Sequence, residues 1–388
     1  DFEKGKGQLN GNVSVVSQDL GTLLRSRDQA DLAKSLKTLN LKAGIEGSLS
    51  NLLISPLTVS SMVSSPDLKK PVELKLSAGE ARANLDKDTL GIKNLSVTGL
   101  GLNAKANIDA QKISTEPAFS GDLNVPAFNL RSLLKSLNIA LPPMADQKTL
   151  TKVAMSADIS GGPSSINLQK LKINLDDTKL QGDINVLDFE GPNLKFGLGI
   201  DAINADRYQE PSKKGKAVTP EAAAAGAASE LPVETLRALK IDGDLVIGSL
   251  VMSGAKMKNI KVSIKADGGL IKLAPVGAEL YEGTYGGDVV LDARGKTSLL
   301  DLKTQLSKVN VEPLIMDTVD NNMLSGVVSF DAALKGRGGD ADSLKKTLTG
   351  NGKFSTVNGI FRGVDAGATL RIVEQMIECT CPLPLPEG

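Results

Sequence analysis

The sequence of 388 residues contains no histidine and no tryptophan, and only 3% of its residues are aromatic. Histidine is the commonest general base in enzymes and the commonest zinc ligand, so its absence removes the usual means of proton transfer and zinc binding. The two cysteines, Cys379 and Cys381, cannot by themselves close a four-coordinate zinc site. A structural or incidental role of this pair is favoured over a redox or metal role, and the pair indicates no compartment. We expect no metal and no cofactor.

The sequence also lacks an excess of charge and a long apolar run. Lysine and arginine number 45, aspartate and glutamate also number 45, and no long run has one sign. Binding to nucleic acid needs a basic stripe, so nucleic acid is not expected as a partner. No run approaches the ~18 consecutive apolar residues of a membrane-spanning helix, so we expect a soluble or surface-attached stretch.

Short motifs that resemble catalytic sites are incomplete. Residues 294–297, Arg-Gly-Lys-Thr, resemble the end of a phosphate-binding loop, but Val290 stands where that motif requires a glycine, and a strand is expected to follow. Ser132 and Lys135 have the spacing of a serine nucleophile and its lysine, but the companion motifs are missing. We therefore expect that the protein is not an enzyme.

Alternation of apolar and polar residues dominates the sequence. This pattern predicts short antiparallel strands with one apolar and one solvated face, and hence a mainly β protein. The alternation is regular at residues 72–77, 100–109, 171–176, 194–201, 262–266 and 328–334. Helical patterns are few and short, at residues 130–137, 233–239, 342–348 and 365–378.

A supersecondary unit recurs along the chain. Asn94, Lys170 and Asn259 each precede an apolar residue at the opening of a similar hairpin. A later strand in each unit ends in an apolar-Asn-apolar step, at Asn129, Asn204 and Asn310. Units that stack side by side build an elongated sheet, because no unit can bury its apolar face alone.

The domain organisation follows from this repeat and from one break in it. We expect a segment of repeated β-hairpins over residues 1–208, then a flexible linker or loop rich in alanine, lysine and proline over residues 209–232. Residues 233–388 form the C-terminal β segment, with a terminal helix and a proline-rich tail. We interpret the two β segments as one continuous structure, not two independent globules.

The apolar face is the feature that points to a function. It consists of leucine, valine, isoleucine and alanine, and the short helices are too few to cover it. Two arrangements satisfy the pattern: a sheet that closes on itself around a filled core, or an open groove whose exposed aliphatic surface binds a ligand. In the second arrangement, the residues predicted to line the groove are Leu100, Leu102, Leu171, Ile173, Phe196, Leu198, Val262, Ile264, Val328 and Phe330.

Several segments of the C-terminal half carry a family resemblance. They are AELYEGTYGG at 278–287, KVNVEPL at 308–314, LSG at 324–326, LTGNGKF at 348–354 and NGIFRGVD at 358–365. Their order and spacing resemble the C-terminal part of the AsmA family, proteins of the Gram-negative cell envelope. The resemblance is firm over residues 245–371 and continues in style before them.

The resemblance implies a fold and a function. AsmA-like proteins are regarded as bridge-like lipid transfer proteins, so we expect an elongated, curved antiparallel sheet, U-shaped in section, with an apolar groove. The implied partners are phospholipids, which the groove carries between inner and outer membranes, the two membranes themselves, and other envelope proteins. The implied location is the periplasm, with an inner-membrane helix that precedes the sequence given. This transport supports outer-membrane integrity.

Two other functions remain open at this stage. The protein could be an assembly factor for outer-membrane proteins, or a structural spacer of the envelope.

Overall fold

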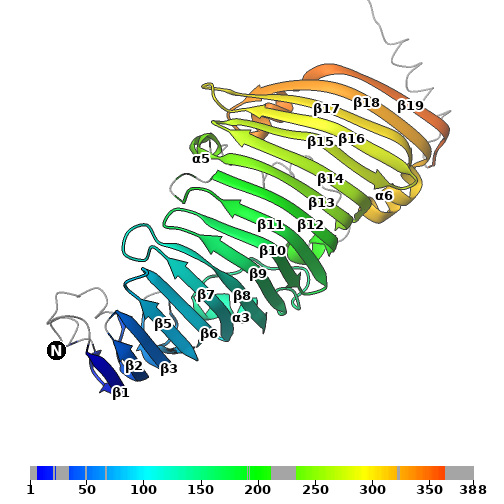
Figure 1. Cartoon of the computed structure of the whole chain (residues 1–388). Coiled ribbons are helices and arrows are strands. Elements are labelled where there is room, and N and C mark those ends of the chain that lie inside the picture. The colour runs from blue at the N-terminus through cyan, green and yellow to red at the C-terminus, as the bar shows by residue number, and fades with distance from the viewer. Residues whose placement is uncertain are drawn as a thin grey trace, which may run out of the picture.

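The computed structural model describes residues 7–20, 22, 35–48, 50–65, 68–189, 191, 193–210, 233–320 and 324–362. These residues form one long, twisted and curved sheet of 19 strands, as expected from the alternation (Figure 1). The strands are β1 (Gln8–Ser17), β2 (Leu39–Ser48), β3 (Asn51–Val63), β4 (Val72–Ala78), β5 (Glu80–Asn84), β6 (Thr89–Gly99), β7 (Leu102–Gln111), β8 (Ala118–Phe128), β9 (Val153–Gly161), β10 (Ile166–Leu175), β11 (Thr178–Val186), β12 (Asn193–Asn204), β13 (Lys240–Met252), β14 (Ala255–Asp267), β15 (Leu270–Leu280), β16 (Gly283–Asp292), β17 (Ser298–Asn310), β18 (Leu324–Gly338) and β19 (Thr349–Phe361). The helices are α3 (Leu130–Ser136), η2 (Ala205–Tyr208), α5 (Val233–Ala238), α6 (Val311–Val319) and α7 (Ala341–Lys346).

The order of strands in the sheet follows their order in the chain. Each strand pairs with its neighbours in the chain, except that β4 and β5 do not pair with each other. Both pair with β3 and with β6, so together they occupy one place in the sheet. The sheet therefore passes without a break from β1 at one end to β19 at the other (Figure 1). This nearest-neighbour pairing explains the elongated shape, because each described strand bonds to its neighbours in the sheet and the sheet grows in one direction.

One pairing among the described strands is parallel. Asn193 of β12 lies opposite Lys240 of β13, and Asn204 lies opposite Val251, whereas the other strand pairs are antiparallel. A parallel pair cannot be joined by a hairpin, so β12 ends and β13 begins at opposite edges of the sheet. The alternation of residues did not predict this parallel step.

Parts of the sequence-based prediction concern residues outside the described ranges. Within the expected linker at 209–232, residues 211–232 lie outside them. The helix expected at 365–378, the proline-rich tail, and Cys379 and Cys381 lie outside them as well.

The short helices lie at the two edges of the sheet. The α3–α6 edge carries α3, η2 and α6, where β8, β12 and β17 end, and the α5–α7 edge carries α5 and α7 (Figure 1). The patterns at 130–137, 233–239 and 342–348 correspond to α3, α5 and α7. Asn129 caps α3 by accepting a 2.8 Å hydrogen bond from the Ser132 N–H, as expected of an N-cap residue. Helix α6 was not predicted, although Asn310 stands before it and Pro313 lies in its first turn, where proline is tolerated.

The recurring residues Asn94, Lys170 and Asn259 share one geometry. Each has a left-handed backbone, with φ of 54°, 50° and 50°, at a shift in strand register. The N–H of Asn94 donates to Asn107 Oδ1 at 2.8 Å, and that of Lys170 donates to Asp183 Oδ1 at 2.9 Å. Such bulges bend a strand and increase its twist, so their recurrence curves the sheet.

Candidate functional site

One face of the sheet is apolar from end to end. Residues directly opposite each other in neighbouring strands point to the same side, so the strand register identifies the members of each face. Leu198 lies opposite Leu245, Leu245 lies opposite Val262, and Val262 lies opposite Val276. In the N-terminal half, a corresponding row runs across β1 to β6 through Val15, Leu41, Val59, Leu76 and Val97. We call this side the apolar face.

The opposite side is charged. Lys195 lies opposite Asp242, Asp242 lies opposite Lys265, and Lys265 lies opposite Lys272. These side chains belong to the same strands as the apolar row and point away from it, because successive residues of a strand alternate between faces. We call this side the charged face.

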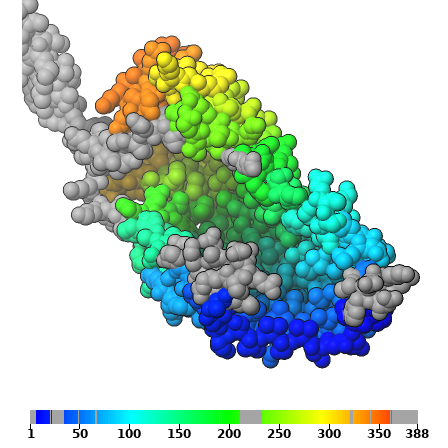
Figure 2. Space-filling view, turned by 90° about the vertical axis from the view of Figure 1, so that its left-hand side faces the viewer, coloured from blue at the N-terminus to red at the C-terminus, as the bar shows by residue number. Residues whose placement is uncertain are grey.

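The pattern of burial places the apolar face on the concave side of the sheet. A hollow runs along the molecule between its two edges, from the yellow and orange C-terminal strands to the blue N-terminal ones (Figure 2). Side chains on the concave side of a curved sheet converge and shield one another. This accounts for the half-buried state of Leu198 and Leu302, whereas the alternating Lys195, Lys265 and Lys303 of the charged face are exposed.

The apolar face is a groove and not a filled core. Large side chains on it remain open to solvent, with exposed fractions of 38% for Leu74, 41% for Val97 and 36% for Phe330. Among the described residues, the largest side chains that are less than 2% exposed are those of Leu171, Val309 and Thr149. A closed β core of this length would bury far more of its leucines and valines. Of the two arrangements that the sequence allowed, the structure has the groove.

The groove is most tightly packed in the middle of the C-terminal half. Ile247 of β13, Ile260 of β14 and Ala278 of β15 are buried, with exposed fractions of 9%, 7% and 9%. Half-buried side chains pack around them on the same face, including Ile200 and Tyr285. This cluster fixes neighbouring strands to one another beneath an open surface.

Most of the predicted lining residues lie on the apolar face. Strand register places nine of the ten there: Leu102, Leu171, Ile173, Phe196, Leu198, Val262, Ile264, Val328 and Phe330. Leu171 and Val328 are buried, with exposed fractions of 1% and 7%, and the others are half-buried or exposed. That these side chains contact lipid stays a prediction.

The tenth residue, Leu100, is placed differently. It lies in the turn between β6 and β7 with φ of 55°, so the strand expected from residue 100 begins at Leu102. A left-handed backbone residue followed by Gly101, with φ of 82°, forms the reversal. The alternating pattern extended through this turn and therefore placed the strand start two residues too early.

The comparison with protein families gives a match over much of the chain. The family model described as the AsmA family matches residues 127–378. The chain belongs to the AsmA family. No curated protein matches the chain, and no solved structure matches it. The AsmA family is associated with the bacterial envelope and is not known as an enzyme family.

Two further features of this AsmA-family chain bear on its chemistry. No helix within the described ranges is both long and apolar enough to cross a membrane. Across the same ranges, no three or more histidine, cysteine, aspartate or glutamate residues gather in a way that could hold a metal ion.

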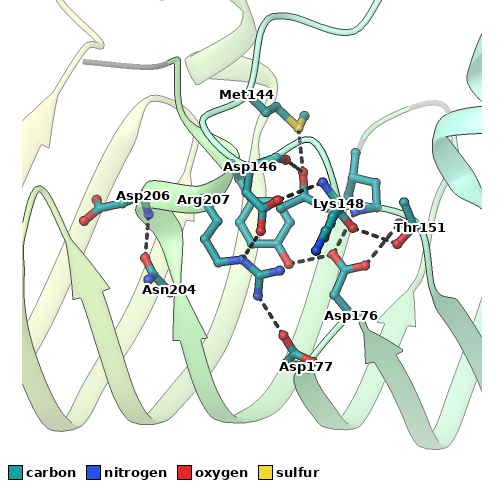
Figure 3. Close-up of polar contacts among 12 residues, drawn as sticks. Met144, Asp146, Lys148, Thr151, Asp176, Asp177, Asn204, Asp206 and Arg207 are labelled. Carbon is teal, nitrogen blue, oxygen red and sulfur yellow. Dashed lines mark hydrogen bonds and ion pairs between the residues drawn. The ribbon is translucent and has the colours of Figure 1, made fainter. Parts of the chain in front are cut away.

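A polar cluster fastens the long connection between α3 and β9 to the groove edge of the AsmA-family sheet (Figure 3). Its residues, which we call the edge cluster, are Asp146, Asp176, Asp177, Arg207 and Tyr208. Arg207 joins two segments, because its Nε donates to Asp146 Oδ2 and its Nη1 to Asp177 Oδ2, both at 2.9 Å. Tyr208 donates its hydroxyl to Asp176 Oδ2 at 3.0 Å.

Asp176 is the acceptor at the centre of this cluster. Its carboxylate accepts hydrogen bonds from the backbone N–H groups of Leu150, Thr151 and Lys152, at 2.7, 3.1 and 3.2 Å. Burial acts to raise the pKa of Asp176, but these hydrogen bonds and that from Tyr208 outweigh it, so the pKa is lowered. Burial and the neighbouring Asp176 carboxylate raise the pKa of Tyr208 to about 12. The edge cluster therefore has a structural role, because its hydrogen bonds hold the connection between α3 and β9 against the edge of the sheet.

Sequence reasoning missed two parts of the site. It did not find the packed Ile247, Ile260 and Ala278, which come together from three strands. It did not find the edge cluster either, since Asp146 and Arg207 are far apart in the chain. The apolar alternation could have identified Ile247 and Ile260, but no local pattern pairs an aspartate with a distant arginine.

Proposed function

We propose that this AsmA-family protein binds phospholipids by their acyl chains along the apolar face and carries them between the inner and outer membranes of a Gram-negative envelope. It would do so in the periplasm, held by an inner-membrane helix outside the sequence given. The observation that carries the proposal is the uninterrupted apolar face of 19 strands, open to solvent along a hollow. Family membership supports an envelope role.

The chemistry of the groove suits acyl chains. An acyl chain needs no hydrogen bonds, and burial of each CH₂ group contributes ~0.8 kcal/mol, so an aliphatic lining binds it firmly with little demand on shape. Rows such as Leu198, Leu245 and Val262 repeat a similar surface from strand to strand. A uniform surface gives a bound chain similar free energy at successive positions, which allows it to move along the groove. Direction and energy input must come from elsewhere.

The charged face of the sheet suits contact with water. Exposed lysines and aspartates, such as Lys195 and Asp242, hydrate the outside of the sheet. Water on one face and acyl chains on the other allow a single sheet to shield lipid tails across an aqueous compartment.

The first experiment asks whether lipid is bound. The protein is purified from a Gram-negative host without added lipid, and the bound material is extracted and identified by mass spectrometry. Co-purifying phospholipid is the expected result. Lipid-free protein that also fails to extract phospholipid from vesicles would contradict the proposal.

The second experiment asks where lipid is bound. A photo-crosslinking amino acid replaces Leu198 or Ile264 on the apolar face, and Lys195 or Lys261 on the charged face serves as the matched control. Irradiation is expected to attach lipid at the first two positions and not at the controls. Equal labelling on the two faces would indicate nonspecific association.

A second candidate function, assembly of outer-membrane proteins, is favoured by one observation. Strand β19 pairs with β18 and with no other described strand, and Phe354, Val357 and Ile360 on it are 66%, 60% and 55% exposed. An open, apolar edge strand can add a strand of another chain. Lipid-free protein that captures an unfolded outer-membrane protein, and loses this capture when Val357→Pro blocks the edge, would favour assembly over lipid transport.

A further inference from the structure

A cavity at the α3–α6 edge combines cations with apolar side chains. It has a volume of about 340 Å³ and is lined by Lys69, Arg131, Lys135, Asn138, Ile139 and Leu141. Lys69 comes from the connection between β3 and β4, and the other residues come from α3 and the chain after it. None of the described residues that line the cavity is acidic, although the chain as a whole has equal numbers of acidic and basic residues.

Hydrogen bonds position Lys69 and Arg131, and Lys135 lies one turn after Arg131 on α3. The Lys69 N–H donates to the Ser136 carbonyl oxygen at 3.3 Å, which brings the β3–β4 connection against α3. The Nε of Arg131 donates to the Thr149 carbonyl oxygen at 3.2 Å, and its Nη2 donates to Thr149 Oγ1 at 3.1 Å. Thr149 is fully buried, so Arg131 is fixed by a rigid partner.

The three positive charges at the cavity repel one another. Arg131 and Lys135 are four residues apart on α3 and so lie on one side of it, where like charges repel. Lys69 adds a third positive charge at the same cavity. Within the described part of the chain, no salt bridge joins any of the three to a carboxylate. A phosphate group would relieve this repulsion through charge-assisted hydrogen bonds.

The apolar part of the cavity indicates that the anion belongs to an amphiphile. Ile139 is 50% exposed beside the cations, and Leu141 is half-buried. Free phosphate has no apolar part that could pack against exposed aliphatic side chains next to the cations. An amphiphile places its head on the cations and its first methylene groups on the aliphatic side chains.

The cavity is close to the groove. Lys69 lies three residues before Val72, where β4 begins, and Arg131 lies three residues after Phe128, the apolar-face residue that ends β8. Three residues of extended chain span ~10 Å, less than the ~15 Å of one leaflet of a bilayer core. One phospholipid is therefore long enough to reach from the cavity to the apolar face. Near this edge, Leu74 of the apolar face is 38% exposed.

We propose that this cavity binds the phosphate of a phospholipid whose acyl chains lie on the apolar face, and so forms a head-group site at the groove edge. The inference rests on the proposed lipid-binding function and adds a position where the head group is recognised. Lys69 and Lys135 contact the phosphate, and Arg131 is the rigid third cation.

The test compares lipids with and without a phosphate. Calorimetry measures binding of dihexanoyl phosphatidylglycerol, below its micelle concentration, of dihexanoylglycerol and of inorganic phosphate. The test variant carries Lys69→Glu and Lys135→Glu. The control variant carries the same charge change on the charged face, Lys105→Glu and Lys172→Glu.

We expect the test variant to bind phosphatidylglycerol about tenfold more weakly than the wild type, because two charge-assisted contacts are lost. Its binding of dihexanoylglycerol should be unchanged, and the control variant should bind both lipids like the wild type. Lys69→Gln with Lys135→Gln should show an intermediate loss, and this pair decides the question if the glutamate pair does not fold.

Four results would overturn the inference. Equal loss of phosphatidylglycerol binding in test and control variants would indicate a general charge effect. Inorganic phosphate that binds as tightly as the lipid would indicate a site for the free anion. If the test variant still binds both dihexanoylglycerol and phosphatidylglycerol, the proposed lipid-binding function stands but the head-group site does not. If the wild type binds neither lipid, the head-group site and the proposed function are both contradicted.

Discussion

Leu198 of β12 and Leu245 of β13 lie directly opposite each other on the apolar face, across the parallel pair of strands. β12 ends at one edge of the sheet and β13 begins at the other, yet the pairing keeps both leucines on the same side. The apolar face therefore continues from the N-terminal segment to the C-terminal one. If lipid moves along the whole groove, it passes this pair.

Charges on the apolar face should block transfer. Leu198→Asp with Ile264→Asp introduces two carboxylates into the path, and an acyl chain that passes them leaves polar groups without water. We expect the rate of phospholipid transfer between donor and acceptor vesicles to fall at least about tenfold. The control, Asn174→Asp with Gln181→Asp, adds the same charge on the charged face and should transfer lipid normally. Unchanged transfer by the apolar-face variant would favour a structural spacer.

The packed cluster beneath the groove should determine local stability. Ile260→Ala removes a side chain that is 7% exposed, so the free energy of unfolding should fall by about 2–4 kcal/mol. The control, Val246→Ala, alters a side chain of a neighbouring strand that is 46% exposed. This change should alter the free energy of unfolding by less than about 1 kcal/mol. Urea denaturation followed by circular dichroism measures both. Equal losses would show that the cluster has no special role.

Two glycines in facing strands should differ sharply in their tolerance of a side chain. Gly182 has φ of 146°, and a Cβ there would meet the Gly197 carbonyl oxygen at 1.9 Å. Gly182→Ala should therefore cost at least about 2 kcal/mol of the free energy of unfolding. Gly197 has open space around the position of a Cβ, so Gly197→Ala should be tolerated. Thermal unfolding of the two variants provides the comparison, and a stable Gly182→Ala protein would argue against this local geometry.

The Tyr208 hydroxyl should lose its proton at an unusually high pH. The chain has three tyrosines, and burial together with Asp176 raises the pKa of Tyr208 to about 12. An absorbance titration at alkaline pH should show a phase at this value that Tyr208→Phe removes. Asp176→Asn removes the neighbouring negative charge and should move the phase to lower pH, although burial keeps the pKa above its usual value. If the phase does not move in Asp176→Asn, the Asp176 carboxylate does not raise the pKa of Tyr208 in solution.

The edge cluster should lose its stabilising effect in acid. The folded-state pKa of Asp176 is lower than its ordinary value of 3.8, so the charged carboxylate stabilises the fold above pH 3.8. As the pH falls through the lower folded-state pKa, the carboxylate is protonated and this stability is lost. At pH 7, Asp176→Asn should lower the free energy of unfolding by about 2 kcal/mol. The difference from the wild type should shrink below pH 3.8, and a difference that stays constant with pH would exclude the charge as its source.

The strands and their faces could be predicted from local alternation. Val262 and Ile264 lie on the apolar face as their spacing required, and so do Val328 and Phe330. Alternation marks neither where a strand stops nor where it bends. That is why Leu100 was placed in a strand, although its left-handed backbone puts it in a turn.

The recurrence at Asn94, Lys170 and Asn259 was visible in the sequence, but its meaning was not. The structure shows that each residue adopts a left-handed conformation at a bulge. The acceptors Asn107 and Asp183 come from the neighbouring strand, so the hydrogen bonds that accompany the bend depend on strand pairing. Local patterns contain no information about that partner.

The sequence by itself determined that this chain forms many strands, each with one aliphatic side, because the two-residue period of a strand is a local property. Only the tertiary structure decided that these sides join into an open groove instead of closing on themselves. That outcome depends on strand register, on bulges whose partners lie in other strands, and on the parallel step between β12 and β13. The same holds for the cavity where Lys69 meets Arg131 and Lys135, since the contact between two distant segments brings their charges together.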